Sequence, residues 1–279
     1  MSRLSFFVKR LVSEGPSLSA RVTMSDNQRG VVGLIHGYAD HAERYDRVAE
    51  VWASQGLSTV AIDLRGHGRS KGPRGYCERF EEYLDDAREL TAQVKSHASG
   101  QPCVLFGHSF GGLVATASVI ADPTPWDAVA LTDPFYGLAL KVPAPKVFAG
   151  KLMSRLVPRF GLPSGLSGKD VTHDAALAHA YDTDPLVFKN ATARWFTEAT
   201  AAQARVQTAV RQLSLPYWMG FGGADPVASL QTARDVFADV GSTDKTMRVY
   251  EGLYHEILNE PEGLSIAAEI GTWMLARMS

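Results

Sequence analysis

The chain has 279 residues, of which 45% are hydrophobic, and this is enough for one large domain with a core and an inserted subdomain. Its 28 lysines and arginines nearly balance its 30 aspartates and glutamates, so the net charge is only -2. A chain with so small a net charge has no overall positive field to attract nucleic acid. We therefore expect an enzyme-sized protein that does not bind nucleic acid.

Short apolar runs alternate with longer segments of helical period along the chain, and this alternation predicts an α/β fold. An antiparallel hairpin is expected in the segment up to residue 23. Buried parallel strands, apolar on both faces, are expected over residues 31–36, 57–63, 102–107, 127–132, 217–221 and 246–250. Helices are expected where apolar residues recur every three or four positions, over residues 44–56, 80–96, 113–121, 230–241 and 264–278.

Between residues 137 and 211 the pattern changes, because helical periods, prolines and aromatic residues continue without a convincing strand. A segment inserted after the strand at 127–132 would lie over the carboxyl ends of the parallel strands, where open α/β sheets hold their sites. We therefore predict a core of residues 1–136 and 212–279 and a helical cap of residues 137–211.

The two cysteines, Cys77 and Cys103, have neither the spacing nor the neighbouring histidines of a zinc site. We expect two reduced thiols, with a single disulfide as the alternative. Lys9 and Arg10 interrupt the apolar residues near the N-terminus, so this segment is too short for a signal-peptide core or a membrane span. The sequence thus predicts a soluble cytoplasmic protein, and nothing in it implies a metal or an organic cofactor.

The stretch Gly107-His108-Ser109-Phe110-Gly111 fits the pattern Gly-x-Ser-x-Gly and stands between a predicted strand and a predicted helix. In that context the serine occupies a tight, strained turn, and the glycines avoid side chains that would collide with the adjacent strand and helix. We therefore predict that Ser109 is a nucleophile. An ordinary glycine-rich turn is the alternative.

A serine nucleophile needs a base, and the base needs an acid to orient it, in the chain order serine, acid, histidine. His255 follows the last predicted strand and is the expected base. Asp225 and Asp133 each follow a strand and compete for the role of the acid. We favour Asp225 because its strand comes next before His255, whereas Asp133 could simply cap the turn before Pro134.

The oxyanion that forms during attack needs N–H donors already in place, and one is the backbone N–H of the residue after the nucleophile, Phe110. A second donor is expected from an early loop, where a tight turn at His36 and Gly37 would point the N–H of Tyr38 toward Ser109. Each such donor lowers the barrier by about 3 kcal/mol.

These motifs resemble those of α/β-hydrolases of the monoacylglycerol lipase and lysophospholipase type. The matching stretches are HGYADHAERYDRVAE, DLRGHGRSKGPRG, GHSFGG, AYDTDPLV and YEGLYHEILNEPE, and together they cover nearly the whole chain from Val31 onward. The resemblance implies the α/β-hydrolase fold, with a mostly parallel central sheet, helices on both faces and a helical cap. It also implies a catalytic triad and an oxyanion hole, formed by Ser109, Asp225 and His255 and by Tyr38 and Phe110, respectively.

The chain departs from that family at two places near the nucleophile. Phe110 stands where family members commonly carry a small or methyl-bearing residue. Thr132 and Asp133 stand where they commonly carry Ser-Ala or Ser-Ser. The first departure concerns the shape of the pocket, and the second raises the question of what Asp133 does.

The sequence thus predicts a serine hydrolase that cleaves a small-molecule lipid ester, such as a monoacylglycerol or lysophospholipid, through an acyl-enzyme. A carboxylesterase, thioesterase or peptidase of the same fold is the alternative, because a triad does not choose between esters, thioesters and amides. A non-catalytic ligand-binding protein is a further alternative. Dehalogenase and epoxide hydrolase chemistry is excluded, because it needs a carboxylate where Ser109 stands.

The predicted cap contains a segment that reads as a basic amphipathic helix. An apolar row at Phe148, Leu152, Leu156 and Phe160 is expected to contact an acyl chain. A cationic row either faces water or leans toward an anionic lipid surface, and it consists of Lys141, Lys146, Lys151, Arg155 and Arg159. The second possibility would make the protein peripheral to membranes.

Overall fold

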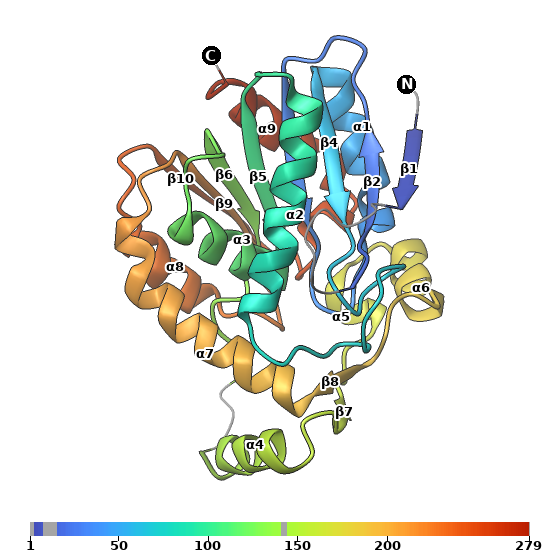
Figure 1. Ribbon diagram of the computed structural model, residues 1–279, viewed down its shortest axis with the longest axis vertical. Coiled ribbons are helices and arrows are strands. Elements are labelled where there is room, and N and C mark those ends of the chain that lie inside the picture. Colours follow the sequence, from blue (N-terminus) through green and yellow to red (C-terminus); the bar gives the residue numbers. More distant parts are fainter. Residues whose placement is uncertain (1–2, 8–15, 141–143, 279) are drawn as a thin grey trace.

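The computed structural model describes residues 3–7, 16–140 and 144–278, and in this part of the chain an eight-stranded sheet forms the centre of the molecule (Figure 1). The strand order is β1-β2-β4-β3-β5-β6-β9-β10. These strands are β1 (Arg3–Phe7), β2 (Ser19–Thr23), β3 (Gly30–Ile35), β4 (Leu57–Ile62), β5 (Cys103–His108), β6 (Ala128–Thr132), β9 (Tyr217–Gly222) and β10 (Lys245–Tyr250). All of the expected strands form.

The sheet is mostly parallel, as expected. β1 and β2 form the expected antiparallel hairpin, and β2 pairs antiparallel with β4. The other neighbours are parallel, so the carboxyl ends of β3, β5, β6 and β9 meet at one edge of the sheet. β10 is also parallel to β9, but it lies at the edge of the sheet and is half buried, unlike the fully buried strand that the sequence predicts.

Helices cover both faces of the sheet, and the side chains of β3 show why its sequence is apolar throughout. Val32 and Leu34 join the cluster that includes α1 (Asp46–Gln55) and α9 (Gly263–Leu275). Val31 and Ile35 join the opposite cluster, with α2 (Glu81–Ala98), α3 (Phe110–Ala121) and α8 (Leu230–Asp239). Because neighbouring residues of a strand point to opposite faces, a strand covered on both sides needs apolar residues at every position.

The segment between β6 and β9 is mostly helical, as expected. It contains α4 (Ala144–Leu156), β7 (Gly161–Pro163), α5 (Gly168–Val171), α6 (Ala175–Thr183), β8 (Asn190–Thr192), α7 (Ala193–Ala209) and the 3-10 turn η2 (Val210–Gln212). The antiparallel pair of β7 and β8 differs from the expectation of no strand in this segment. Each of these strands has only three residues, which is too short for a strand period to show in the sequence.

Helix α7 connects this segment to the helices that cover the sheet. Trp195, Ala199, Ala202 and Val206 are buried in the same cluster as the residues of α3. Figure 1 shows α7 below α3 and α8, with α4 on its outer side, away from the sheet. One face of α7 therefore anchors the segment to the helices that cover the sheet.

Two smaller expectations can be compared with the described residues. Cys77 and Cys103 are both buried and both free, as predicted. None of the described helices is both long enough and apolar enough to span a membrane.

Candidate active site

Ser109 stands in the turn between β5 and α3, at the carboxyl edge of the sheet. Its φ of 52° and ψ of -118° lie in a region that residues other than glycine rarely adopt. A Cβ on Gly107 would lie 2.6 Å from the carbonyl oxygen of Gly111, and one on Gly111 would lie 2.2 Å from that of Ile35. The glycines are therefore needed because three backbone segments meet here, as the Gly-x-Ser-x-Gly pattern predicts.

The structure brings together the three residues that the sequence selects. The Nε2 atom of His255 lies 2.8 Å from Oγ of Ser109, and its Nδ1 atom lies 2.7 Å from Oδ2 of Asp225. An ionised carboxylate can only accept hydrogen bonds. Nδ1 of His255 is therefore protonated and donates a hydrogen bond to Asp225. The neutral ring then accepts the hydroxyl proton of Ser109 at Nε2.

Asp225 is fixed by backbone donors as well as by His255. Its Oδ1 atom accepts hydrogen bonds from the N–H groups of Val227, at 2.7 Å, and Ala228, at 3.1 Å. Its side chain has no exposed surface. These bonds hold the carboxylate in one orientation against the imidazole.

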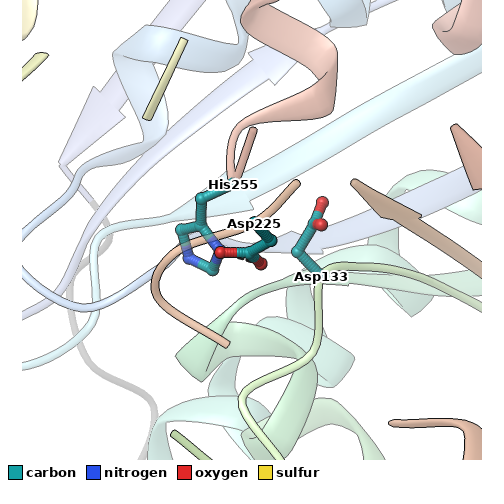
Figure 2. A group of neighbouring side chains, drawn as sticks. All are labelled: Asp133, Asp225 and His255. Atoms are coloured by element: carbon teal, nitrogen blue, oxygen red, sulfur yellow. Dashed lines mark hydrogen bonds and ion pairs between the residues drawn. The ribbon is translucent and has the colours of Figure 1, made fainter. Parts of the chain in front are cut away.

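Asp133, the other candidate for the acid, does not bond to His255. It follows β6 with a φ of 45° and is fully buried. Its Oδ1 atom accepts a 2.7 Å hydrogen bond from the N–H of Gly222, whereas its Oδ2 atom has no hydrogen-bond partner among the described residues. Figure 2 shows the Asp225 side chain between the imidazole of His255 and the carboxyl group of Asp133.

The pKa values of Asp133 and His255, the two ionisable groups beside Asp225, are both shifted, and the causes differ. Burial, followed by the negative charge of Asp225, holds the pKa of Asp133 well above its usual range. Burial also opposes a charge on His255, but Asp225 attracts the imidazolium and accepts its hydrogen bond, and the net effect raises the pKa of His255. The site therefore favours the neutral form of Asp133 and the protonated form of His255.

The residue next to His255 takes part in a buried ion-pair network that joins two loops. Glu256 accepts from the guanidinium of Arg44, with a shortest distance of 2.6 Å, and Arg44 also donates to Asp40 at 2.9 Å. Asp40 accepts a 2.9 Å hydrogen bond from the hydroxyl of Tyr45. Burial favours the neutral form of Glu256, but the charge of Arg44 outweighs it and lowers the pKa of Glu256. This network holds the histidine loop against the loop after β3.

A second set of contacts joins the histidine loop to the segment after α5. The N–H of Glu256 donates to the carbonyl of Val171 at 2.9 Å. The buried carboxylate of Glu260 accepts from the N–H of His173 at 2.9 Å and from that of Tyr254 at 2.8 Å. The loop that carries His255 is thus bonded both to the loop after β3 and to residues 171–173.

The loop after β3 passes directly beside the nucleophile. A Cβ on Gly37 would lie 3.3 Å from Cδ2 of His108 and 3.4 Å from Cβ of Ser109, so this backbone passes close to the nucleophile. Tyr38 follows, and its ring stacks on that of Trp195 with 3.5 Å between the ring centres. The expected donor positions, Tyr38 and Phe110, both line the cavity in front of Ser109.

That cavity has a volume of about 310 Å³, and Ser109 and His255 form part of its wall. Most of its other side chains are apolar, with polar groups at a few positions, as is typical of small-molecule sites. The apolar side chains include Phe110, Phe135, Leu138, Leu140, Leu166, Val171, Trp195, Phe196 and Val227, and the polar ones are Tyr38, Asp40, His108, Ser164, Tyr181 and Glu256.

Sequence reasoning missed the residues that line this cavity from the segment between β6 and β9. Trp195 and Phe196 lie at the start of α7, where an aromatic pair gives no signal that separates cavity lining from core packing. The Arg44–Glu256 pair was missed for another reason, because two charged residues far apart in the sequence give no sign that they meet. The glutamate directly after His255 is the one local signal that could have found the pair.

Asp133, Asp225 and His255 also place one oxygen or nitrogen atom each within 4.8 Å of one another, as metal ligands would (Figure 2). These atoms already take part in the hydrogen bonds described above. The Nδ1–H of His255 donates a hydrogen bond to Asp225, and Asp133 accepts one from the N–H of Gly222. A bound cation would have to break the first of these bonds, so the donor set fits a hydrogen-bonded chain better than a metal site.

The parallel sheet, the strained serine turn and the histidine on the last loop place this molecule in the class of α/β-hydrolases. Residues 26–262 match the protein family described as "Serine aminopeptidase, S33". The chain therefore belongs to this family of α/β-hydrolases.

Several relatives of known name resemble the chain over most of its length. A monoacylglycerol lipase of Mycolicibacterium smegmatis is 32% identical over 259 residues, which cover 92% of this chain and 91% of the relative. A phospholipase of Bacillus subtilis is 34% identical over 242 residues, or 85% of this chain and 92% of the relative. The crystal structure of a monoacylglycerol lipase of Paleococcus ferrophilus is 26% identical, covers 95% of this chain and 100% of its own, and superposes with a TM-score of 0.84. The resemblance to monoacylglycerol lipases is thus confirmed.

Proposed function

We propose that this protein is a serine hydrolase that cleaves carboxylic esters of lipid type through an acyl-enzyme. The observation that carries the proposal is the continuous hydrogen-bonded chain from Ser109 through His255 to Asp225 at an apolar cavity. A serine hydroxyl beside a neutral imidazole can transfer its proton as it attacks, whereas a serine in an ordinary turn cannot. The names of the relatives support lipid esters as the substrate class.

In the proposed mechanism, Oγ of Ser109 attacks the ester carbonyl while Nε2 of His255 takes the hydroxyl proton. Asp225 holds the ring and stabilises the imidazolium. The backbone N–H groups of Phe110 and Tyr38 are the proposed donors to the oxyanion. His255 then gives its proton to the leaving alcohol, and a water molecule repeats the sequence on the acyl-enzyme to release the fatty acid and restore Ser109.

The apolar wall of the cavity supports an acyl chain as the part of the substrate that is recognised. Phe135, Leu138 and Phe196 offer surface to a hydrocarbon chain, and each buried methylene contributes about 0.8 kcal/mol. The polar groups, including Tyr181 and Ser164, are available to a head group. We therefore propose a monoacylglycerol or a lysophospholipid as the substrate.

This substrate class is tested by measuring kcat/KM for a series of p-nitrophenyl esters with increasing acyl length. We expect the value to rise from acetate to a medium or long chain, because each added methylene finds apolar surface in the cavity. Monoacylglycerol and lysophospholipid of the best chain length then identify the head group. A flat or falling profile from acetate upward would contradict the acyl site, and faster cleavage of a matched thioester or amide would favour the alternative activities.

We also propose that residues 137–211 act as a cap on a core of residues 1–136 and 212–279. The segment follows β6, whose carboxyl end lies next to Ser109. Its side chains supply a large part of the cavity wall, and these include Leu138, Leu166, Val171, Tyr181, Trp195 and Phe196. The cap would thereby select the acyl chain while the core supplies the reacting groups. For the protein as a whole we propose the cytoplasm, which the two free cysteines support.

The apolar row expected to contact the acyl chain needs a correction. Leu152, Leu156 and Phe160 are 48%, 69% and 48% exposed and do not line the cavity. The reason is that α4 lies on the outer side of α7, which places this row away from Ser109 (Figure 1). The side chain of Phe148 lies outside the described residues.

We propose that this exposed row contacts a lipid surface instead. Leu140, Val157 and Leu162 are also exposed nearby, so several large apolar side chains face water in one short part of the chain. Such a group is unusual on a soluble surface and is typical of an interaction site. Three exposed cations accompany it, namely Lys151, Arg155 and Arg159, which would favour an anionic surface. Lys141 and the side chain of Lys146 lie outside the described residues.

This proposal is tested by sedimentation of the protein with phosphatidylcholine vesicles that do or do not contain phosphatidylglycerol. We expect stronger binding to the anionic vesicles, and weaker binding as salt is added, because surface charges are screened. The double variant Lys151→Glu and Arg155→Glu should lose this preference, whereas Arg234→Glu on α8 should keep it. Equal binding of the wild-type protein to both vesicles would contradict the preference for an anionic surface, and no binding to either would contradict the contact itself.

A further inference from the structure

The carboxyl group of Asp133 has no role in the proposed mechanism, although it lies next to the reacting groups. One oxygen of Asp133, one oxygen of Asp225 and one ring nitrogen of His255 lie within 4.8 Å of one another (Figure 2). Asp133 is fully buried, and its Oδ2 atom has no hydrogen-bond partner among the described residues. A buried polar atom without a partner is costly, so its presence calls for an explanation.

We propose that Asp133 is a reserve acid for His255, held as a neutral carboxylic acid while Asp225 is charged and able to take the negative charge when Asp225 is neutralised. This inference rests on the proposed function, because it assigns a second acid to the same site. In this role Asp133 is a positioning residue that acts on the reaction through His255.

The hydrogen bonds show why the charge resides on Asp225 and not on Asp133. Two carboxylates so close in a buried site cannot both ionise without strong repulsion. Asp225 accepts from three donors, which are Nδ1 of His255 and the N–H groups of Val227 and Ala228. Asp133 accepts from Gly222 alone. The better solvated carboxyl group therefore keeps the charge, and the other keeps its proton.

The backbone around Asp133 fixes its distance from the histidine loop. The N–H of Asp133 donates to the carbonyl of Gly220 at 2.9 Å, and its side chain holds the N–H of Gly222 at 2.7 Å. A Cβ on Gly222 would lie 2.2 Å from the carbonyl oxygen of Tyr254, so β9 and the histidine loop are in direct contact here. This packing fixes the backbone of Asp133 beside the histidine loop.

The other charged groups near Asp133 do not explain its neutral state as well as Asp225 does. Glu256 is paired with Arg44, and Glu260 accepts hydrogen bonds from Tyr254 and His173. After burial, Asp225 is the largest influence that raises the pKa of Asp133. The groups that face Asp133 are Asp225, His255, Glu256, Glu260 and the phenol of Tyr250. Neutralising Asp225 removes the largest of these charges while burial remains, so it should lower the pKa of Asp133 and allow this group to ionise at a lower pH than in the wild-type protein.

The test compares kcat/KM over a range of pH for Asp225→Asn, for Asp133→Asn and for the double variant. In Asp225→Asn we expect a second increase of the residual activity with pH, in addition to the increase that follows from deprotonation of His255, because Asp133 ionises and supplies the missing charge. The double variant should lose about a further tenfold and should lack this second increase. A second double variant, Asp225→Asn with Asp122→Asn, removes an exposed carboxylate at the end of α3 and should behave like Asp225→Asn. Equal rates and equal pH profiles for Asp225→Asn and Asp225→Asn/Asp133→Asn would overturn the proposal.

A stability measurement keeps the proposal testable if the variants of Asp225 fail to fold. The folded pKa of Asp133 is raised, so the folded chain keeps a proton that the unfolded chain releases above a pH of about 4. The wild-type protein should therefore lose stability relative to Asp133→Asn as the pH rises from 4 toward 8, measured by urea unfolding. A constant difference between the two proteins over this range would mean that Asp133 is not held neutral, and would also overturn the proposal.

Failure of the proposed function gives a different result from failure of this inference. A wild-type protein that neither hydrolyses esters nor reacts with a fluorophosphonate probe would refute the serine hydrolase. The urea measurement would still report the proton on Asp133 in that case. Active wild type with identical Asp225→Asn and Asp225→Asn/Asp133→Asn variants would refute the reserve acid alone.

Discussion

Ser109→Ala is expected to lower kcat for ester hydrolysis by about 10⁶-fold, as loss of the nucleophile does in serine hydrolases of known mechanism. The substitution removes Oγ, which lies 2.8 Å from Nε2 of His255 and is the atom that would attack the carbonyl. The cavity and the proposed oxyanion donors remain, so binding of an ester should change far less than kcat. Rates with a p-nitrophenyl ester and labelling by a fluorophosphonate probe both measure this loss.

Ser118→Ala is a matched control for this prediction, because it removes a hydroxyl from α3, the helix that follows Ser109, at a half-buried position away from the cavity. It should keep the rate and the labelling of the wild-type protein. If Ser109→Ala retained activity within tenfold of wild type, another residue would have to be the nucleophile. A wild-type protein without any labelling would favour a non-catalytic ligand-binding protein.

Asp225→Asn is expected to lower kcat by about 10³- to 10⁴-fold, because an amide does not select the tautomer of His255 that accepts the proton of Ser109. It should also change the pH profile. His255 acts as a base only when it is neutral, so activity rises as the pH passes upward through the pKa of His255. Asp225 raises that pKa, and its loss should therefore move the acid limb of kcat to lower pH.

Asp133→Asn is the comparison that decides between the two candidate acids. Its carboxyl group does not bond to the imidazole, so we expect a loss much smaller than that of Asp225→Asn. The opposite order, with Asp133→Asn the more severe change, would make Asp133 the acid of the resting enzyme. Circular dichroism of each variant shows whether a loss of rate reflects a loss of fold.

The sequence was informative about the sheet and the reacting residues because both depend on local patterns. Strands such as Val31–Ile35 lie in a sheet covered on both faces, so nearly every position is apolar and the run is easy to recognise. The position of Ser109 follows from the glycines that its turn requires. His255 follows from chain order, since the fold leaves few places for a base after the last strand.

Other features depend on which residues meet in space, and here the sequence was silent or misleading. The apolar row at Leu152 and Leu156 has the period of a packed helix face, but its period does not say what it packs against. The pKa of Asp133 is raised by burial and then by the nearby charge of Asp225, 92 positions away in the chain. The sequence identifies both candidate acids and favours Asp225 by strand order alone, whereas the hydrogen bonds of the structure distinguish the two directly.

The bonds on both sides of the histidine loop have a mechanical consequence. The loop that carries His255 is tied through Glu256 to the carbonyl of Val171, and through Glu260 to the N–H of His173. A displacement of residues 171–173, which belong to the proposed cap, would therefore strain the loop that holds the imidazole beside Ser109. Such a displacement would alter the contact between Nε2 of His255 and the hydroxyl of Ser109, so the position of these residues and proton transfer would be mechanically coupled.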